Sequence, residues 1–336
     1  MDFDHLYKTL ADQPKYRVKQ AKEAIFKQLV SDWSQSTTLP KELKEQLNQN
    51  CSLEIKGQIF SAQKSKTTKA LLTLSDGLKI ETVLMGHKDG RQTVCVSSQV
   101  GCAMACKFCA TGKLGLSRNL TYNEIIEQVL FFDRYLKEQN SRVSNIVFMG
   151  MGEPFANYDA VLKAIKYFND SEAFNIGARH ISISTSGIIP GIEKLTAEKI
   201  QVNLAISLHA ANNKLRSELM RINDRFPLEK LLKAVDKYIQ KTGRKVMFEY
   251  LMIKGVNDSL KHAEELSRLM AKPLHMVNLI PYNPTGVYLP SSQHTIDQFK
   301  NYLRKRQVEV SQRYTFGQEI DAACGQLANK AKKVAK

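Results

Sequence analysis

The chain has 336 residues, of which 43% are hydrophobic, and its formal net charge is +16 at pH 7. A chain of this length exceeds one ordinary hydrophobic core, so we expect a catalytic domain and a smaller accessory domain. No apolar run is long enough to span a membrane, and the first residues lack the basic and apolar regions of a signal peptide. These features exclude a membrane-spanning protein and favour a cytoplasmic one.

The positive charge is concentrated in three basic stretches, residues 15–22, 304–306 and 330–333. Such fields attract nucleic acid through counterion release and electrostatic steering. The alternative is a solvated, lysine-rich surface, because charge alone specifies neither a fold nor a partner. Nucleic acid is therefore one candidate partner.

The first 90 residues differ in pattern from the rest of the chain. Apolar residues at helical spacing predict short helices between residues 5 and 50. From residue 53 to residue 83 the pattern changes to the alternation that is typical of strands. We therefore expect an N-terminal accessory domain over residues 1–90, helical over 1–50 and with a small antiparallel sheet over 51–90.

Strands and helices alternate over residues 91–327, the predicted catalytic core, which a basic tail follows at 328–336. The predicted strands are 93–97, 144–149, 180–184, 202–207, 245–252 and 275–279. The first predicted helix starts at a capping box formed by Thr121 and Glu124, and the others are 160–168, 190–195, 227–240, 263–270 and 296–306. Repeated β-α units imply an α/β fold with a parallel sheet, and about six units are fewer than the eight of a closed barrel.

Three of the six cysteines are crowded into one stretch, as Cys102, Cys106 and Cys109. This spacing brings three thiolates within reach of one centre, and soft sulfur ligands select zinc, copper(I) or an iron–sulfur cluster. A tetrahedral zinc site needs a fourth ligand, and residues 110–116 supply none. Three ligands suit a four-iron, four-sulfur cluster with one open iron. A zinc site that a distant residue completes is the alternative.

A set of mostly polar residues lies at or just after the ends of several predicted strands. They are Gly152, Glu153, Ser184, Ser207, Leu208, His209 and Asn283. In parallel β/α folds the active site is formed at the carboxyl ends of the strands. Glycine lets the backbone approach a ligand closely, and a carboxylate can accept a hydrogen bond from an ammonium group. Each residue alone has an ordinary structural explanation, but together they predict one ligand-binding cradle.

The cysteine spacing, followed downstream by residues 150–154, resembles the radical S-adenosylmethionine (radical SAM) superfamily. The resemblance implies a partial (β/α)6 TIM-like barrel with one [4Fe–4S] cluster held by Cys102, Cys106 and Cys109. In this superfamily the open iron binds SAM, and one electron cleaves SAM to a 5′-deoxyadenosyl radical. The cradle residues named above would bind SAM, with Gly152 and Glu153 at its amino group.

Six motifs in order resemble the RlmN family within that superfamily: 95–102, 150–154, 182–190, 204–209, 278–284 and 320–327. Members of the family methylate carbon 2 of an adenine in 23S ribosomal RNA, and some also methylate an adenine beside the tRNA anticodon. The resemblance therefore implies a radical SAM RNA methyltransferase whose partner is 23S rRNA, with tRNA as a second candidate. It also implies an electron donor such as flavodoxin or ferredoxin, and we expect a cytoplasmic monomer whose accessory domain binds RNA.

The family mechanism assigns roles to three further residues. Cys324 takes a methyl group from one SAM, and a second SAM supplies the radical that activates the S-methyl group, so that each turnover uses two. After the carbon is added to the adenine, Cys95 attacks the Cys324 sulfur, which releases the product and leaves a disulfide. Glu81 matches a position assigned as proton acceptor, although a glutamate on a surface strand is the ordinary alternative.

Two other functions stay open on the sequence alone. Part of the N-terminal half, including residues 14–20, also resembles the Cfr-type resistance enzymes, which methylate carbon 8 of the same adenine. Pro154 favours the carbon-2 family, because the resistance enzymes tend to carry alanine there. The alternative from a different class is a non-catalytic, zinc-containing RNA-binding protein.

Overall fold

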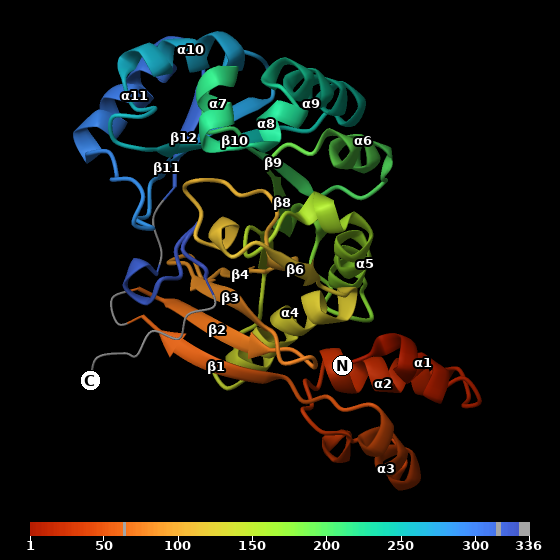
Figure 1. Cartoon of the computed structure of the whole chain (residues 1–336). Coiled ribbons are helices and arrows are strands. Elements are labelled where there is room, and N and C mark those ends of the chain that lie inside the picture. The colour runs from red at the N-terminus through yellow and green to blue at the C-terminus, as the bar shows by residue number, and fades with distance from the viewer. Residues whose placement is uncertain (63–64, 314–316, 329–336) are drawn as a thin grey trace.

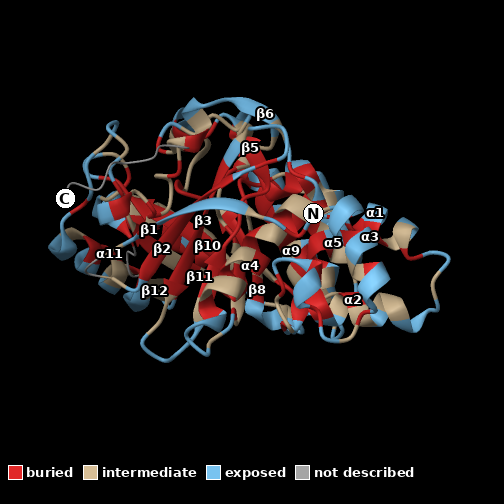
Figure 2. Cartoon of the chain, turned by 90° about the horizontal axis from the view of Figure 1, so that it is seen from below, coloured by how far each residue is buried: buried red, intermediate tan, exposed pale blue. Residues whose placement is uncertain are grey.

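The structure is a computed structural model that describes residues 1–62, 65–313 and 317–328. Most of the predicted basic tail, residues 329–336, lies outside the described residues. Within them, ten strands form one mixed sheet in the order β1-β2-β3-β4-β7-β8-β9-β10-β11-β12, and β5 and β6 form a separate pair. Buried residues follow the sheet, and the outer helices carry the exposed ones (Figure 2). None of the described helices is long and apolar enough to cross a membrane.

Helices form most of the first 50 residues, as the apolar spacing predicts. They are α1 (Phe3–Thr9), α2 (Tyr16–Phe26), the 3-10 turn η1 (Trp33–Gln35) and α3 (Lys41–Asn50). Trp33 is fully buried, and its indole nitrogen donates to the Cys51 carbonyl at 2.7 Å. These helices lie to one side of the sheet (Figure 1). Arg134, in helix α4 (Tyr122–Lys137), donates to the carbonyls of Val30 and Leu53 and so connects this region to the core.

The next three strands are antiparallel: β1 (Lys56–Ser61), β2 (Thr67–Thr73) and β3 (Lys79–Gly86). They do not form a separate small sheet, because β3 also pairs with β4 (Gln92–Cys95) and so continues into the large sheet. Nearly every residue of β2 and β3 is buried, and pairing along the β3 edge is what satisfies the backbone there. A domain boundary at residue 90 stays a prediction; it coincides with the change from antiparallel to parallel pairing.

All six predicted core strands are present and parallel to one another. After β4 they are β7 (Asn145–Phe148), β8 (Ile181–Thr185), β9 (Asn203–Ser207), β10 (Val246–Met252) and β11 (His275–Pro281). A further parallel strand, β12 (Glu309–Gln312), pairs with β11 at the edge. The sequence does not predict β12, because it is short and all of its residues are exposed or half-buried.

The predicted core helices are confirmed as α4 (Tyr122–Lys137), α5 (Tyr158–Asn169), α6 (Ile189–Ala197), α9 (Leu228–Thr242), α10 (Leu260–Met270) and α11 (Gln293–Lys305). Pro227 is the N-cap of α9 rather than its first helical residue. Elements that the sequence does not predict are α7 (Asn213–Leu219), α8 (Ile222–Arg225), β5 (Gln99–Gly101), β6 (Leu116–Asn119) and the 3-10 turns η2 (Thr111–Lys113), η3 (Pro154–Asn157), η4 (Ala178–His180) and η5 (Gln318–Ile320).

The predicted capping box at the start of α4 is confirmed. Thr121 Oγ1 accepts from the Glu124 backbone N–H at 3.2 Å, and Glu124 Oε2 accepts from the Thr121 N–H at 2.8 Å. Thr121→Ala removes one of these bonds and should lower the free energy of unfolding by about 1 kcal/mol, whereas Thr121→Ser should stay near wild type. Chemical denaturation measures both variants. Equal stability of the alanine variant and the wild type would contradict the prediction.

Candidate active site

The three crowded cysteines lie in a loop that the β5–β6 pair holds at both ends. β5 ends at Gly101, directly before Cys102, and the Cys102 N–H donates to the Gly115 carbonyl at 2.8 Å. Gly101 has φ +78, and a Cβ there would lie 1.9 Å from the Gly115 oxygen. Only glycine therefore allows the two ends of this loop to meet.

All three sulfur-bearing residues line one large cavity of about 900 Å³. Other residues of its wall are Gly152, Glu153, Ser184, Ser207 and His209, so that the predicted cradle and the cysteine loop face the same space. Gly152 has φ +97, and a Cβ there would lie 2.5 Å from the Gln99 side chain. The backbone can pack this closely against Gln99, beside the cavity, only because the residue is glycine.

Two of the loop thiols resist ionisation in the absence of a bound cation. Burial raises the pKa of Cys102 to about 12, and burial raises the pKa of Cys106 well above its ordinary value. The neighbouring thiols and Glu153 raise both pKa values further. A metal centre supplies the positive charge that deprotonates such ligands. Three soft thiols that line one cavity fit an iron–sulfur cluster.

Glu153 is buried at the carboxyl end of β7, beside the cysteine loop. Its Oε2 accepts from the Ser186 N–H at 2.6 Å and its Oε1 from the Phe155 N–H at 3.0 Å. Burial raises the pKa of this carboxyl group, and the backbone donors partly oppose that shift. A positively charged ligand group in the cavity would stabilise the carboxylate further.

His209 and Arg216 connect the strand ends to the cysteine loop. Burial holds the pKa of His209 at about 3, so its ring is neutral, and the ring packs edge-on against Phe108 with centroids 4.8 Å apart. Arg216, which the sequence does not single out, is fully buried and donates to the carbonyls of Ser186 at 2.7 Å and Ser207 at 3.2 Å. This cation fixes the ends of two adjacent strands.

Two of the predicted cradle residues lie elsewhere. The side chain of Leu208 is packed in the hydrophobic core, outside the wall of the large cavity. Asn283 lines a second, smaller cavity of about 480 Å³, where its Nδ2 donates to the Cys324 carbonyl at 3.2 Å. Asn283 therefore holds the backbone of Cys324 in this structure.

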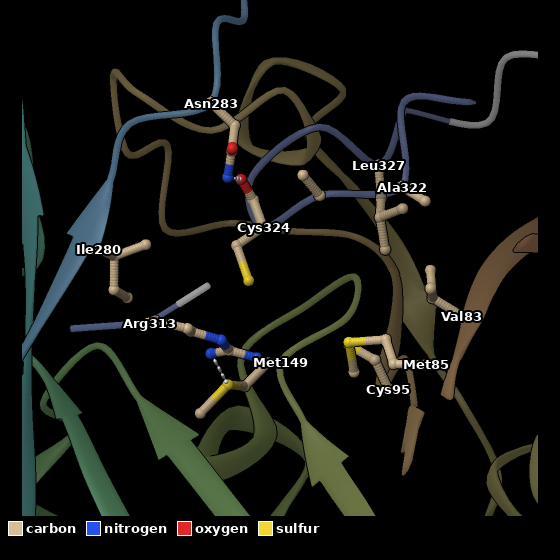
Figure 3. Close-up of a pocket in the computed structure, with 11 residues that line it drawn as sticks. Val83, Met85, Cys95, Met149, Ile280, Asn283, Arg313, Ala322, Cys324 and Leu327 are labelled. Atoms are coloured by element: carbon tan, nitrogen blue, oxygen red, sulfur yellow. Dashed lines mark hydrogen bonds between the residues drawn. The ribbon is translucent and has the colours of Figure 1, made fainter. Parts of the chain in front are cut away.

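Cys324 lies where the two cavities meet. It lines the large cavity together with the cysteine loop and the small cavity together with Cys95 (Figure 3). Cys95 ends β4, opposite Val83 of β3 in the sheet register. All six cysteines are free thiols in this structure, so the disulfide between Cys95 and Cys324 stays a prediction.

Arg313 is a further residue of the site that the sequence does not identify. It follows β12 directly, lines both cavities, and donates to Met149 Sδ at 3.1 Å (Figure 3). The neighbouring Cys324 raises the pKa of Arg313, with smaller contributions from Glu249 and Cys95.

Glu81 is fully buried in β3, which excludes the surface-strand alternative for this residue. Its Oε1 lies 2.9 Å from Lys69 Nζ, and its Oε2 accepts from the Ala328 N–H at 2.8 Å. In the described part of the chain it lies outside the walls of both cavities.

Comparisons with known proteins show the family of the chain. The profile of the Radical SAM superfamily matches residues 96–267. A protein of Dictyoglomus thermophilum named "Probable dual-specificity RNA methyltransferase RlmN" is 46% identical over 94% of this chain and 91% of its own length. A protein of the same name from Geobacillus kaustophilus is 47% identical over 95% of this chain and 88% of its own length.

The chain belongs to the RlmN family of radical SAM enzymes. The crystal structure of a radical SAM methyltransferase from Sphaerobacter thermophilus shares its fold, with a TM-score of 0.94, 43% identity and 98% of each chain covered. This protein is thus a methyltransferase that uses a [4Fe–4S] cluster and SAM, and the predicted partial barrel is confirmed. The zinc-protein alternative is not supported.

Cys95 gives a test of the site's electrostatics that does not depend on turnover. Burial and the neighbouring Cys324 raise the pKa of Cys95 to about 12, so it is a neutral thiol at pH 7. Because only the thiolate reacts with iodoacetamide, labelling of Cys95 in the folded enzyme should rise about tenfold per pH unit between roughly pH 7 and pH 10. Peptide mass spectrometry measures this, with denatured protein as the control. A plateau below pH 9 would contradict the burial.

Proposed function

We propose that this RlmN-family enzyme methylates carbon 2 of an adenine in 23S rRNA, with the adenine beside a tRNA anticodon as a second substrate, and that Cys324 carries the methyl group. The observation that supports this most is the position of Cys324, which lines the cavity of the cysteine loop and the cavity of Cys95. A residue that receives a group at one centre and passes it on at another needs access to both.

The chemistry of the target explains why a carrier is needed. Carbon 2 of adenine lies between two ring nitrogens and is electron-poor, so it cannot attack the methyl group of SAM as a nucleophile. A thiolate can, by ordinary displacement. Arg313 lines the same two cavities as Cys324, and Asn283 holds the backbone of Cys324 through its carbonyl.

The residues of the large cavity would hold the cluster and SAM. Cys102, Cys106 and Cys109 are the proposed iron ligands, and Glu153 is the proposed acceptor for the SAM amino group. Ser184, Ser207, His209 and the backbone at Leu208 would bind the rest of SAM. When bound, the cluster and SAM supply the 5′-deoxyadenosyl radical. Most of the wall around these residues is apolar.

Cys95 and Glu81 would complete the reaction after the carbon has been transferred to the adenine. Cys95 faces the same small cavity as Cys324. Cys324 is close enough to raise the pKa of Cys95 through Coulomb interaction. It would attack the Cys324 sulfur, form a disulfide and release the methylated RNA, and an external reductant would restore both thiols. Glu81 is the proposed proton acceptor, although its carboxylate accepts from the Ala328 N–H in this structure.

The RNA would approach the cavities as folded RNA with the target base turned out of its stack. The curated relatives are named RNA methyltransferases, which supports RNA as the substrate. The accessory domain over residues 1–90 and the basic stretches would contact phosphates. In the first stretch Lys22 already pairs with Asp170 at 3.1 Å and Glu172 at 3.3 Å, so Lys15 and Lys19 are the better candidates. A flavodoxin or ferredoxin would be the electron donor, and we propose a cytoplasmic monomer.

Cys324→Ala should keep the fold and the cluster but abolish RNA methylation, because the methyl carrier is gone. The test is nucleoside mass spectrometry of rRNA and tRNA after reaction with the reduced enzyme, using authentic 2-methyladenosine and 8-methyladenosine standards. The wild type should produce the 2-methyl product. Full activity of the alanine variant would reject the carrier role, and an 8-methyl product would assign the Cfr-type reaction instead.

A further inference from the structure

A buried ion pair lies beside the part of the chain that carries Cys324. Lys69 Nζ and Glu81 Oε1 are 2.9 Å apart, and their side chains are only 2% and 1% exposed. Lysine and glutamate are almost never buried this completely without a partner. The strand register explains the contact: Glu81 pairs with Leu71, which makes Lys69 its diagonal neighbour on the same face of the antiparallel pair.

The second oxygen of the same carboxylate holds the chain just after Cys324. Glu81 Oε2 accepts from the N–H of Ala328, four positions after Cys324, at 2.8 Å. Hydrogen bonds to ionised acceptors are about twice as strong as those between neutral groups. The carboxylate therefore connects Lys69 to residues 324–328, which we call the Cys324 segment.

The opposite side of the Cys324 segment is held by the chain that follows the last loop cysteine. The Ala110 N–H donates to the Gly325 carbonyl at 2.7 Å, and Thr111 Oγ1 donates to the Leu327 carbonyl at 2.6 Å. The segment is thus fixed between the cysteine loop and Glu81. Of these contacts, the bond to Glu81 depends on a buried charge and hence on Lys69.

The position of Glu81 suggests that this contact opens during the reaction. Val83, two residues further along the same strand face, lines the small cavity, and so does Leu327 of the Cys324 segment. In the described residues Glu81 lies outside that wall, with Ala328 bonded to its carboxylate. The Cys324 segment must shift before this carboxylate can reach a base in the cavity.

We propose that Lys69 is a positioning residue for the Cys324 reaction, because its ion pair holds the Glu81 side chain where it fastens the Cys324 segment over the two cavities. While Ala328 is bonded to Glu81, the Cys324 segment holds Cys324 between the cluster cysteines and Cys95. When Ala328 is released, the same carboxylate oxygen becomes available for the proton-accepting role of Glu81. That consequence rests on the proposed function, whereas the fastening itself does not.

The test compares Lys69→Met, which removes the charge at similar length, with Lys69→Arg, which keeps it. Lys79→Met is the matched control, because Lys79 is an exposed lysine at the start of the same β3 strand. Hydrogen exchange is measured by mass spectrometry on the full-length, cluster-containing enzyme without RNA. In Lys69→Met the peptide covering residues 325–328 should exchange about tenfold faster, the change expected when one hydrogen bond to a charged group is lost. Lys69→Arg and Lys79→Met should match the wild type.

Iodoacetamide labelling of Cys324 in the same samples should accelerate in Lys69→Met alone. Unchanged exchange at residues 325–328 in a folded Lys69→Met variant would overturn the proposal, as would equal effects of the Met and Arg substitutions. If Lys69→Met does not fold, the neutral pair Lys69→Met with Glu81→Gln avoids an unpaired buried charge. The amides of residues 325–328 should still exchange faster in this double variant than in the wild type. An exchange rate equal to that of the wild type would overturn the role of the charge. If exchange responds as expected while the wild type leaves RNA unmethylated, only the proposed function fails.

Discussion

The site depends on the hydrogen bonds that join the cysteine loop to the chain around Cys324. Ala110 and Thr111 follow the loop cysteines directly and bond the carbonyls of Gly325 and Leu327. These residues are separated by more than 200 positions in the sequence, as the Thr111–Leu327 pair shows with a separation of 216. One bond joins backbone to backbone and the other joins the short Thr111 side chain to backbone, so together they set where Cys324 lies relative to the three loop thiols.

The sheet supplies the rigid frame for this contact. Its parallel strands end on one side, where the cradle residues follow β7, β8 and β9, and β12 adds Arg313 at the same side. The antiparallel strands β2 and β3 extend the frame and bring Lys69 and Glu81 behind the Cys324 segment. One continuous sheet therefore carries the ligand cradle, Cys95 and the buried Lys69–Glu81 pair, which bonds the Cys324 segment from outside the two cavities.

Much of the frame is predictable from local patterns. The succession of strand and helix patterns over residues 91–327 identifies the six core strands, and the Thr121 capping box identifies the start of α4. Such patterns do not reveal which strands share a sheet, so the expected small separate sheet is in fact continuous with the core through β3 and β4. β12 escapes prediction because a short, partly exposed strand has little apolar pattern.

Some residues of the candidate site can be predicted from the sequence, and others are found only in the structure. The spacing of three cysteines predicts the cluster ligands Cys102, Cys106 and Cys109. Resemblance to the RlmN family identifies Cys95 and Cys324. Arg313, Arg216 and Lys69 carry no such signal, because a buried cation has the same sequence appearance as one on the surface. Their contacts depend on how strands and loops pack: Lys69 meets Glu81 across a pair of neighbouring strands, and Arg313 meets Cys324 only after the fold has formed.

The central claim is that the methyl group passes through Cys324 on its way to RNA. The most direct measurement gives the reduced enzyme SAM with a deuterated methyl group, first without RNA, and then follows the label by peptide and nucleoside mass spectrometry. The label should appear on Cys324 and then be transferred, with loss of deuterium to the radical, to the adenine when RNA is added. Labelled RNA formed by an enzyme whose Cys324 peptide never carries the label would contradict the account.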